Sequence, residues 1–433
     1  MKGIYDVTDF GATGDGVADD SNAIQAAIEM AKIKEKNYGA VVWFPPGKYR
    51  IGSGIVIEEF VTLSGIGWGG GGNTNAGTWI KVDNTQIIPF SIKASGVVIR
   101  DIGIFHEQPV PKPEWRPDDY KFAISIEADD VKIQNICLLN PTHGILLHRE
   151  DPSEGKESTT GRITLDGIWG QPLATGIQID NAWDVIRINN VHFWPFWSGA
   201  DKENGKYVAD YMFGAAQGII SKRNDNPFLS NIFMLGYHNG IHFTVNNNGH
   251  TNKFHIANAD IDGCHTALFI DGEAPKDGKH DSTSGQIVNF TAQGRAGEHE
   301  FKGEKREDCL EYEDAEEDKE VKFCSATGIH VDAEKVTVQC SNIRLQTFGS
   351  NCIRVAGNCT RLHFENLYCA DWDRKGKGFP AIEARYDASI YIARASLDLF
   401  DHGLRGKELF GEEYGGKIHR DTPLHGQNQD QCH

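Results

Sequence analysis

Residues 254–263 read FHIANADIDG, and this stretch decides the fold. Apolar and polar residues alternate along it with the period of a β-strand, so Asp260 and Asp262, two positions apart, point to the same side. The apolar residues need the core, which leaves the two aspartates on the outer surface. The stretch therefore predicts a strand that presents a pair of carboxylates to solvent.

The pattern around Asn258 recurs along the chain from about residue 90. Its frame is apolar-x-apolar-x-Asn or Asp-apolar-x-apolar, and it appears around Asp101, Asn135, Asp166, Asn190, Asn231, Asn258, Asn289, Asn342 and Asn366. A second frame, a small residue followed by an apolar strand, follows most of these, as in Gly144-Ile145, Gly176-Ile177, Gly218-Ile219, Gly240-Ile241 and Gly328-Ile329. Two short strands per unit at a regular spacing are typical of a solenoid.

An asparagine at one fixed place in successive strands distinguishes between the possible all-β architectures. In a parallel β-helix the amides would stack at inward turns and bond from one rung of the coil to the next. A β-sandwich gives no reason for this repetition. The sequence therefore predicts an all-β chain folded as a parallel β-helix.

The start of the chain combines strands with one helix. An N-cap at Asp20-Ser21 and an apolar stripe at helical spacing predict a helix from about Ser21 to Lys34. Residues 9–20 (DFGATGDGVADD) and 42–49 (VWFPPGKY) resemble the opening of pectate-lyase-like right-handed parallel β-helix proteins, which include phage tailspike depolymerases and proteins related to glycoside hydrolase family 28.

This resemblance covers about the first 60 residues and carries several expectations. It implies a right-handed coil whose N-terminal α-helix caps the open end, where exposed strand edges would invite aggregation. It also implies a homotrimer that acts outside the cell or on a virion. Asp15, Asp19 and Asp20 are interpreted as turn and helix-capping residues rather than as metal ligands.

Three segments are expected: residues 1–60 as the cap, 61–400 as the coil, and 401–433 as a poorly ordered tail. Loop insertions are predicted near 106–121, 150–160, 197–216 and 296–325. Cys137, Cys340 and Cys369 are expected to be small buried residues, and Cys309 and Cys324, which flank the acidic insertion, are candidates for a disulfide in an oxidising setting.

Composition excludes several partners for this chain of 433 residues. A net charge of -18 argues against nucleic acid, because binding to phosphates relies on lysine and arginine. We find no signal-peptide pattern at the start and no apolar run long enough to insert into a membrane, so we expect a soluble chain. No P-loop, Rossmann or Ser-His-Asp pattern stands in a usable context, so neither a cofactor nor a metal is implied.

Aligning the rungs on the asparagine predicts a groove for an extended sugar chain. The second and fourth positions after each asparagine face outward, and these columns contain aromatic rings that can stack on sugars together with amides and charged groups that can bind hydroxyls. The candidate substrate-binding residues in and beside these columns are Trp194, Trp197, Tyr237, His238, His192, Gln293 and Arg344.

Two adjacent carboxylates in such a groove favour glycoside hydrolysis. One carboxylic acid protonates the leaving oxygen, and one carboxylate activates water or attacks the anomeric carbon. Asp260 and Asp262 are the first candidates, with Asp271 across the following turn as the reserve partner and Asp180, beside Asp184, in a competing pair. Residues two apart on a strand leave both inverting and retaining geometries open.

Two other functions fit the same pattern. A polysaccharide lyase would act by β-elimination on a uronate polymer, with His192, His238, Arg295 or Arg344 as base or as partner of the substrate carboxylate. A spike or adhesin would bind glycan along the rungs without cutting it. The substrate is expected to be a bacterial capsular polysaccharide or exopolysaccharide, or a pectin-like polymer.

Overall fold

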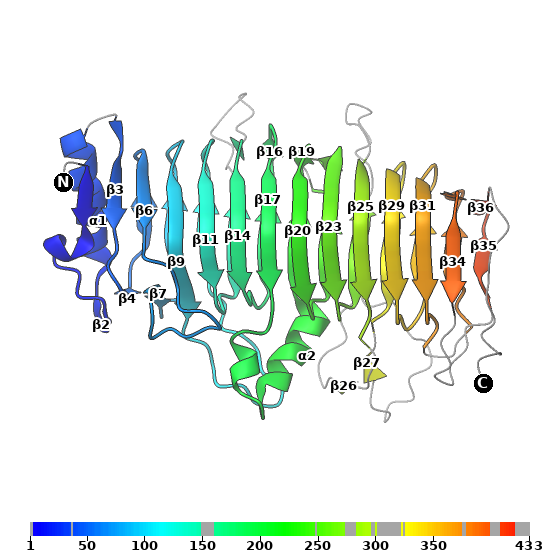
Figure 1. Cartoon of the computed structure of the whole chain (residues 1–433), viewed down its shortest axis with the longest axis horizontal. Coiled ribbons are helices and arrows are strands. Elements are labelled where there is room, and N and C mark those ends of the chain that lie inside the picture. Colours follow the sequence, from blue (N-terminus) through cyan, green and yellow to red (C-terminus); the bar gives the residue numbers. More distant parts are fainter. Residues whose placement is uncertain are drawn as a thin grey trace.

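A computed structural model describes residues 3–35, 38–148, 160–246, 249–272, 283–295, 299–300, 322–323, 325–374, 378–398 and 408–420. Figure 1 shows an elongated coil in which the rungs follow one another in chain order from the N-terminal to the C-terminal end. Strands of successive rungs pair in parallel, as in β20 with β23 and β23 with β25. The predicted parallel β-helix is thus confirmed, and its right-handedness stays a prediction.

The described residues form one large sheet of eighteen strands and a second sheet of twelve. The large sheet contains β1 (Ile4–Asp6), β2 (Asp15–Asp19), β3 (Ala40–Trp43), β4 (Gly47–Ile51), β6 (Val61–Ser64), β7 (Thr78–Val82), β9 (Val98–His106), β11 (Lys132–Leu138), β14 (Thr164–Gly170), β17 (Arg187–Phe193), β20 (Phe228–Leu235), β23 (Phe254–Asp262), β25 (Ser284–Gln293), β29 (Thr337–Gln346), β31 (Arg361–Ala370), β33 (Ser389–Ile392), β34 (Ala395–Asp398) and β36 (Lys417–Arg420).

The second sheet forms another side of the coil. It contains β5 (Ile55–Ile57), β8 (Phe90–Ile92), β10 (Phe122–Ile126), β12 (His143–Leu147), β15 (Thr175–Ile179), β18 (Gln217–Ser221), β21 (Asn239–Phe243), β24 (Thr266–Gly272), β28 (Thr327–Ala333), β30 (Ile353–Ala356), β32 (Ile382–Arg385) and β35 (Phe410–Glu413). Shorter pairings join β13 (Thr160–Gly161), β16 (Ala182–Trp183), β19 (Asn224–Asp225) and β22 (Thr251–Asn252), and β26 (His299–Glu300) with β27 (Lys322–Phe323).

Each long strand of the large sheet bends at one residue. In β23 this corner is Asn258, which has a φ of 56°, in the left-handed region that asparagine tolerates better than most residues. The two halves of β9 pair with different strands, the first half with β6 and the second with β7. A rung therefore has three strand segments rather than the two predicted.

The three segments of each rung define three faces of the coil. The strand halves before the corner residue form the first face, and the strand halves after it form the second face. The second sheet forms the third face.

The corner asparagines form a ladder of side-chain hydrogen bonds along the coil. Asn289 Nδ2 donates to Asn258 Oδ1 at 3.0 Å, Asn342 Nδ2 to Asn289 Oδ1 at 3.0 Å, and Asn366 Nδ2 to Asn342 Oδ1 at 3.0 Å. The predicted rung-to-rung amide bonds are thus present. Their predicted inward position is wrong, because these side chains are exposed. The left-handed corner turns each amide outward and keeps the apolar neighbours on both sides facing the core.

The core consists of apolar side chains stacked in register. One column contains Ile99, Ile133, Leu165, Ile188, Leu229, Ile256, Ile287, Cys340, Phe364 and Ile392. Every member is at most 4% exposed. Burying a side chain of this size stabilises a fold by about 1.5–3 kcal/mol, so each rung contributes through contacts with its neighbours on both sides.

The N-terminal helix α1 (Ser21–Glu35) lies at the N-terminal end of the coil beside β1 and β3 (Figure 1). Its buried stripe includes Ile24, Ala27, Ile28 and Ala31. The helix matches the predicted range to within one residue, and its role as a cap stays a prediction.

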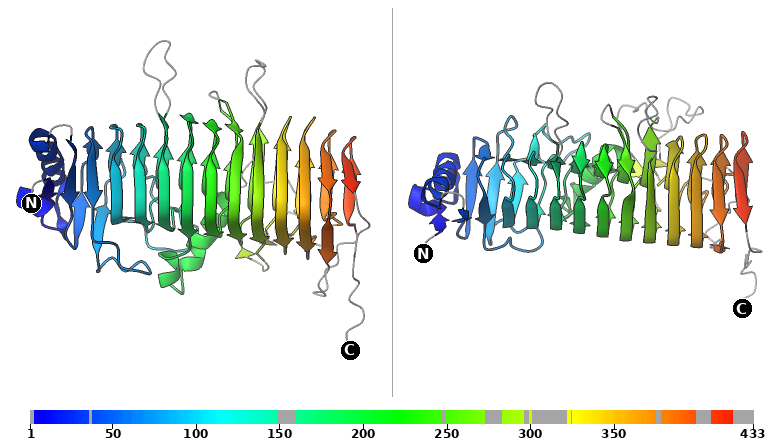
Figure 2. Two further views of the ribbon diagram at one scale, coloured as in Figure 1. Left: turned by 45° about the horizontal axis from the view of Figure 1, so that its top comes forward. Right: turned by 90° about the horizontal axis from the view of Figure 1, so that it is seen from above.

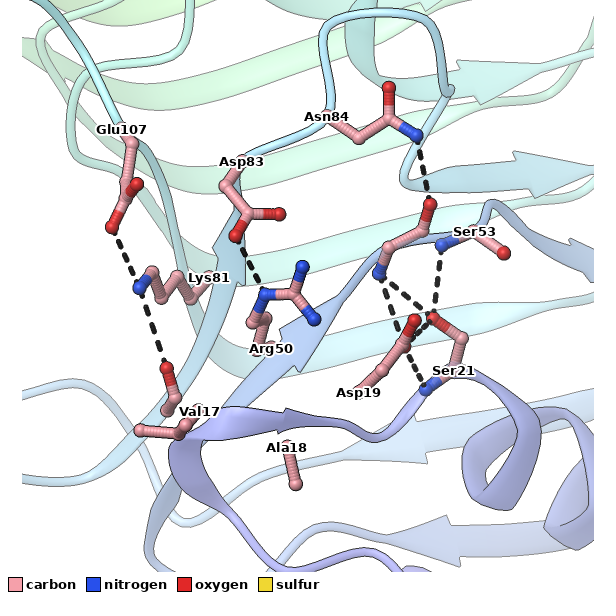
Figure 3. Close-up of polar contacts among 12 residues, drawn as sticks. Val17, Ala18, Asp19, Ser21, Arg50, Ser53, Lys81, Asp83, Asn84 and Glu107 are labelled. Carbon is pink, nitrogen blue, oxygen red and sulfur yellow. Dashed lines mark hydrogen bonds and ion pairs between the residues drawn. The ribbon is translucent and has the colours of Figure 1, made fainter.

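Polar contacts tie the start of α1 to the first rungs, as Figure 3 shows. Asp19 Oδ1 accepts hydrogen bonds from Ser21 N and Gly52 N, and Ser21 Oγ accepts from Gly52 N and Ser53 N. Asp15 and Asp20 likewise accept backbone N–H groups, from Val17 and Thr13 respectively. These contacts are those of turn and capping residues, as predicted.

The insertions vary in structure. Residues 197–216 contain the short helix η3 (Ser198–Ala200) and α2 (Gly205–Ala215), which lies at the C-terminal ends of β17 and β20 in Figures 1 and 2. Nearly all of the 150–160 and 296–325 insertions, with Cys309 and Cys324, lies outside the described residues. None of the described helices has the length and hydropathy needed to cross a bilayer.

The coil continues past residue 400. β35 pairs with β32 through Phe410–Glu413, and β36 pairs with β33 through Lys417–Arg420. His419, predicted to be a tail residue, belongs to β36, and its ring stacks on Tyr391 at 4.5 Å between centroids. The expectation that the strand pattern stops near residue 400 is therefore wrong, because these last strands lack the asparagine that marked the earlier ones.

Candidate active site

Asp260 and Asp262 lie on the second face, as their strand pattern predicts. Ala259 and Ile261, which alternate with them, are 3% and 1% exposed and point into the core. Asp260 is in register with Phe233 and Thr291 on the adjacent rungs, and Asp262 with Leu235 and Gln293. The alternation on this half of β23 therefore holds both carboxylates on the outer surface of the coil.

The two carboxyl groups differ electrostatically. Burial raises the pKa of Asp262 to about 6, and the charge of Asp260 and a hydrogen bond with it act in the same direction. Burial also raises the pKa of Asp260, while the hydrogen bond from Asp262 and the positive charge of Arg344 oppose that rise. Asp262 therefore holds a proton to higher pH and Asp260 is the member of the pair that ionises first.

Polar side chains follow the carboxylate pair on the second face toward the C-terminal end. Arg344 Nη2 donates to Gln346 Oε1 at 3.1 Å, and Gln346 Nε2 donates to Gln293 Oε1 at 2.9 Å. The Arg344 guanidinium also lies 5.4 Å from the centre of the Tyr368 ring. Arg344 and Gln293, two predicted binding residues, are thus held side by side next to the carboxylates.

Aromatic rings lie on the second face toward the N-terminal end from the carboxylate pair. His192 stacks on Trp169 with 4.6 Å between ring centres and also contacts Phe233 at 5.1 Å. Burial lowers the pKa of His192, so its ring is neutral at pH 7. Trp194, 42% exposed, packs against Phe233 at 5.9 Å and presents an apolar surface to solvent. The predicted residues His192 and Trp194 thus lie two rungs from the carboxylate pair.

Two other predicted binding residues are buried instead. Tyr237 is fully buried, and its hydroxyl donates to the Pro172 carbonyl at 3.0 Å. His238 is 6% exposed, with Nδ1 3.1 Å from the Phe213 carbonyl of α2. Their placement in the groove was wrong because both follow Gly236, which has a positive φ and ends the strand alternation.

Trp197 occupies an intermediate position. It is half-buried, its ring packs against Trp115 at 5.9 Å, and it contacts the core beneath the loop insertions. It therefore belongs to the wall beside α2 rather than to the open groove surface.

Asp271 does not join the carboxylate pair. It lies near the end of β24 on the third face, five residues past the start of that strand, or roughly 17 Å along it. Its Oδ1 is 3.0 Å from His242 Nε2. Burial alone would raise its pKa, but the hydrogen bond and charge of His242 outweigh burial and lower the pKa. Asp271 is therefore not the reserve partner that was predicted for Asp260 and Asp262. It forms a separate His–Asp pair with His242.

Asp180 is also separate from the groove. It is 7% exposed at the end of β15 on the third face, where it accepts a hydrogen bond from Asn246 Nδ2 at 2.7 Å. Its predicted partner Asp184 forms an ion pair with Arg162 at 2.9 Å. The competing pair therefore consists of two carboxylates with different partners, away from the second face.

Trp169 and Asp398 on the second face did not enter the prediction, and Tyr368, which stood in the predicted outward column after Asn366, was not among the predicted binding residues. Trp169 stands in the outward column on β14, where Gly167 replaces the corner asparagine that was used for alignment. Tyr368, on β31, shares a hydrogen bond with Asp398 on β34, and burial together with Asp398 raises the Tyr368 pKa. Apolar spacing around Gly167 and Ala395 is the signal that would have placed them.

The described residues include no cluster of three or more His, Cys, Asp or Glu arranged to hold a metal ion.

Comparison with known proteins supports the fold and the origin of the N-terminal region. Residues 4–94 match the family model of rhamnogalacturonase A/epimerase, pectate lyase-like. The predicted resemblance of this region to pectate-lyase-like β-helix proteins is thereby confirmed.

Curated relatives match only a short part of the chain. A stretch of 72 residues is 43% identical to alginate lyase 7 of Azotobacter vinelandii, covering 15% of this chain and 8% of that enzyme. The same identity and length hold for mannuronan C5-epimerase AlgE4 of the same organism, of which 12% is covered. The match thus spans a small fraction of the length of these relatives.

Solved structures match over nearly the whole chain at low identity. The N-terminal fragment of bacteriophage phi29 gene product 12 aligns with a TM-score of 0.52 and 13% identity, covering 97% of this chain and 71% of that one. The catalytic unit of a GH87 α-1,3-glucanase from Streptomyces thermodiastaticus aligns with a TM-score of 0.50 and 12% identity, covering 100% and 70%. At these identities the likeness concerns the parallel β-helix fold.

Proposed function

We propose that this protein hydrolyses glycosidic bonds of a polysaccharide, with Asp262 as the acid and Asp260 as the carboxylate. The observation that carries the proposal is the unequal proton affinity of two neighbouring carboxyl groups in one groove. Burial and Asp260 raise the pKa of Asp262 to about 6, while Arg344 favours the charged form of Asp260. Hydrolysis needs one protonated and one ionised carboxyl group, and the hydrogen bond between Asp262 and Asp260 holds one proton on this pair.

The groove gives each residue a role in this reaction. Asp262 donates its proton to the leaving glycosidic oxygen, and Asp260 activates water or attacks the anomeric carbon. Trp194 offers a ring for a sugar to stack on, and the exposed Gln293 and Arg344 bind hydroxyls beyond the carboxylates. A bacterial capsular polysaccharide or exopolysaccharide, or a pectin-like polymer, supplies the extended chain that such a groove accommodates.

Activity of Asp260→Asn and Asp262→Asn on a panel of capsular polysaccharides and exopolysaccharides tests the proposal. Each change should lower kcat by about 10³-fold on any polymer that the parent cuts, within the range for general acid–base groups. Asp332→Asn, which changes an exposed carboxylate on the third face, should retain full activity. Full activity of both groove variants would refute the assignment.

A second candidate is β-elimination or epimerisation on a uronate polymer. It is supported by the N-terminal likeness to an alginate lyase and mannuronan epimerases, and by the exposed guanidinium of Arg344, which can neutralise a substrate carboxylate. Both reactions begin by removing the proton next to that carboxylate. Ultraviolet absorbance of an unsaturated product identifies elimination, a changed sugar ratio in proton NMR without shortening identifies epimerisation, and new reducing ends alone identify hydrolysis.

A non-catalytic spike that only binds glycan would give binding without any of these products.

The tailspike-like opening of the chain also supports a homotrimer that acts outside the cell or on a virion. Sedimentation equilibrium of the purified chain measures the assembly, and a mass of one or two chains would contradict the trimer.

A further inference from the structure

A shallow trough lies on the first face, one corner away from the proposed active site. It has a volume of about 480 Å³ and is formed by rungs of β25, β29, β31 and β33 and the residue after β33. Its outward-facing lining consists of Gln286, Gln339, His363 and Tyr391, which are in register, and of Val288, Ser341, Glu365 and Ala393 beside them. The proposed hydrolysis does not use any of these residues.

One edge of the trough is a row of hydrogen-bonding side chains. Gln286 Nε2 donates to Gln339 Oε1 at 3.4 Å, and Tyr391 stacks on His363 at 4.5 Å between centroids with 6° between planes. Because His419 stacks on the other side of Tyr391, the tyrosine presents its edge and hydroxyl rather than its ring face. Within the described part of the chain, the His363 ring nitrogens and the Tyr391 hydroxyl have no hydrogen-bond partner, so they are available to a ligand.

The asparagine ladder runs along the corner beside the trough, because Asn289, Asn342 and Asn366 directly follow the lining residues Val288, Ser341 and Glu365. Asn289, Asn342 and Asn366 bond to one another through single amide hydrogen bonds, and their exposed side chains keep further donor and acceptor capacity. The trough therefore runs along the coil between two rows of hydrogen-bonding groups that repeat at the rung spacing of about 4.8 Å.

The trough carries little net charge. Glu365, the carboxylate among its lining residues, forms an ion pair with Arg394 at 2.9 Å. The other lining side chains are amides, a hydroxyl, a phenol, an imidazole, a thiol and apolar groups, and none of them carries a fixed charge. This lining differs from the second face, where Asp260, Asp262 and Arg344 bring formal charges into the groove.

We propose that the trough is a second glycan-binding site, specific for a neutral polysaccharide chain and independent of the carboxylate pair. Amide, hydroxyl and imidazole groups in two parallel rows match the hydroxyls along both edges of an extended sugar chain.

The lining does not fit other classes of ligand. A protein partner would need a desolvated apolar core, whereas Val288, 40% exposed, is the one large apolar side chain that faces outward in the trough. Nucleic acid would need several free cations. A peptide strand would need an unpaired sheet edge, whereas β29 pairs on both sides with β25 and β31.

Isothermal titration calorimetry with neutral oligosaccharides tests the proposal. The probes are maltohexaose, laminarihexaose and cellohexaose, with oligogalacturonate as the anionic comparison, and the protein is Asp262→Asn so that no probe is cut. Ser341→Arg places a bulky charge in the trough. Ser230→Arg places the same charge in the same column on β20, outside the trough, and is the matched control.

We expect a neutral probe to bind at least tenfold more weakly to the Ser341→Arg variant and unchanged to the Ser230→Arg variant, and oligogalacturonate to be unaffected by either. Absence of binding by all neutral probes, or binding that Ser341→Arg leaves intact, would overturn the proposal. Dissociation of an oligomer by Ser341→Arg in sedimentation would overturn it in favour of a subunit interface. Because hydrolysis is measured separately with Asp262 present, failure of this site leaves the proposed function standing.

Discussion

Asp262 owes its proton affinity to its surroundings, and the contribution of its neighbour can be measured. Replacing Asp260 by Asn removes a like charge and the hydrogen bond that protonated Asp262 makes to it, so the Asp262 pKa should fall below about 6, while burial, the largest cause of the rise, should keep it above the ordinary value of about 4. Titration of the carboxyl carbon by ¹³C NMR in both proteins measures the shift. A pKa that stays near 6 in Asp260→Asn would show that burial alone raises it.

The same value predicts the pH dependence of activity. Asp262 must be protonated and Asp260 ionised, so kcat should fall as the pH rises through about 6 and should also fall at lower pH, where Asp260 takes up a proton. The alkaline limb of the kcat profile on a cleaved polymer measures this. A limb that lies two or more pH units higher would assign the acid to another group.

Replacing Trp194 tests whether the aromatic side chains of the second face bind sugar. Its ring is 42% exposed, so Trp194→Ala should leave the melting temperature nearly unchanged while raising KM by about tenfold through loss of stacking on a sugar, a contribution of about 1–1.5 kcal/mol. Phe228→Ala is the matched control, because Phe228 is 41% exposed but stands on the first face outside the trough. Equal changes in KM for both variants would contradict the role of Trp194.

At the scale of the residue, strand alternation predicted the direction of the site side chains correctly inside the strands and wrongly at the strand ends. Asp260, Asp262, His192, Trp194, Gln293 and Arg344 all follow a corner on one straight segment, so their outward direction could be predicted. Tyr237 and His238 follow Gly236, where the backbone leaves the strand and alternation no longer specifies direction. The electrostatic difference between the two aspartates depends on burial and on Arg344 two rungs away, which only the packed coil brings together.

At the scale of the element, the corner determines the cross-section of the coil. The prediction treated each asparagine frame as one strand, although Ile256 and Ala259 are both buried three positions apart, a spacing that flat alternation does not allow. That odd spacing is the signal of the bend. It separates the first face from the second and so distinguishes the trough from the groove.

Gly167 occupies the corner of β14 and leaves a gap in the amide ladder. Its φ is 72°, and an added Cβ would meet its nearest neighbours at 3.4 Å, so asparagine fits there. Gly167→Asn should stabilise the fold by about 1 kcal/mol, through a new amide hydrogen bond and a less flexible unfolded chain. Thermal unfolding followed by circular dichroism measures the change in melting temperature.

The matched control is Gly167→Ala. Alanine adds the Cβ in the same left-handed conformation without an amide, so it should destabilise the fold by about 1–2 kcal/mol. If the asparagine variant melted no higher than the alanine variant, the ladder would contribute nothing measurable at this corner.

At the scale of the whole molecule, stability depends on contacts between neighbouring rungs. Deleting residues 408–433 removes β35 and β36, which pair with β32 and β33, and should lower the melting temperature by several degrees. Deleting only residues 421–433 keeps both strands and should leave it unchanged. Differential scanning calorimetry compares the two, and equal melting temperatures would show that the last rung adds no stability.

The architecture was the part that could be predicted most fully, because each rung repeats the pattern and one alignment serves all. The helix over Ser21–Glu35 was also predictable from its cap and its stripe. The strands past residue 400 were not, because β35 and β36 carry no asparagine frame. The third-face partners of Asp180 and Asp271 could not be predicted either, since they come from residues 29 to 66 positions away in the chain.

The length of this coil can change during evolution in steps of one rung. The aromatic rings of β17 and the carboxylates of β23 are separated by two rungs, so their spacing along the coil is a whole number of steps of about 4.8 Å. A gene duplication or deletion of one complete rung between them would change that distance by one step and leave every remaining register intact. Adding or removing whole rungs can therefore adapt a coil of this kind to polymers of different repeat length, while the packing of its core stays the same.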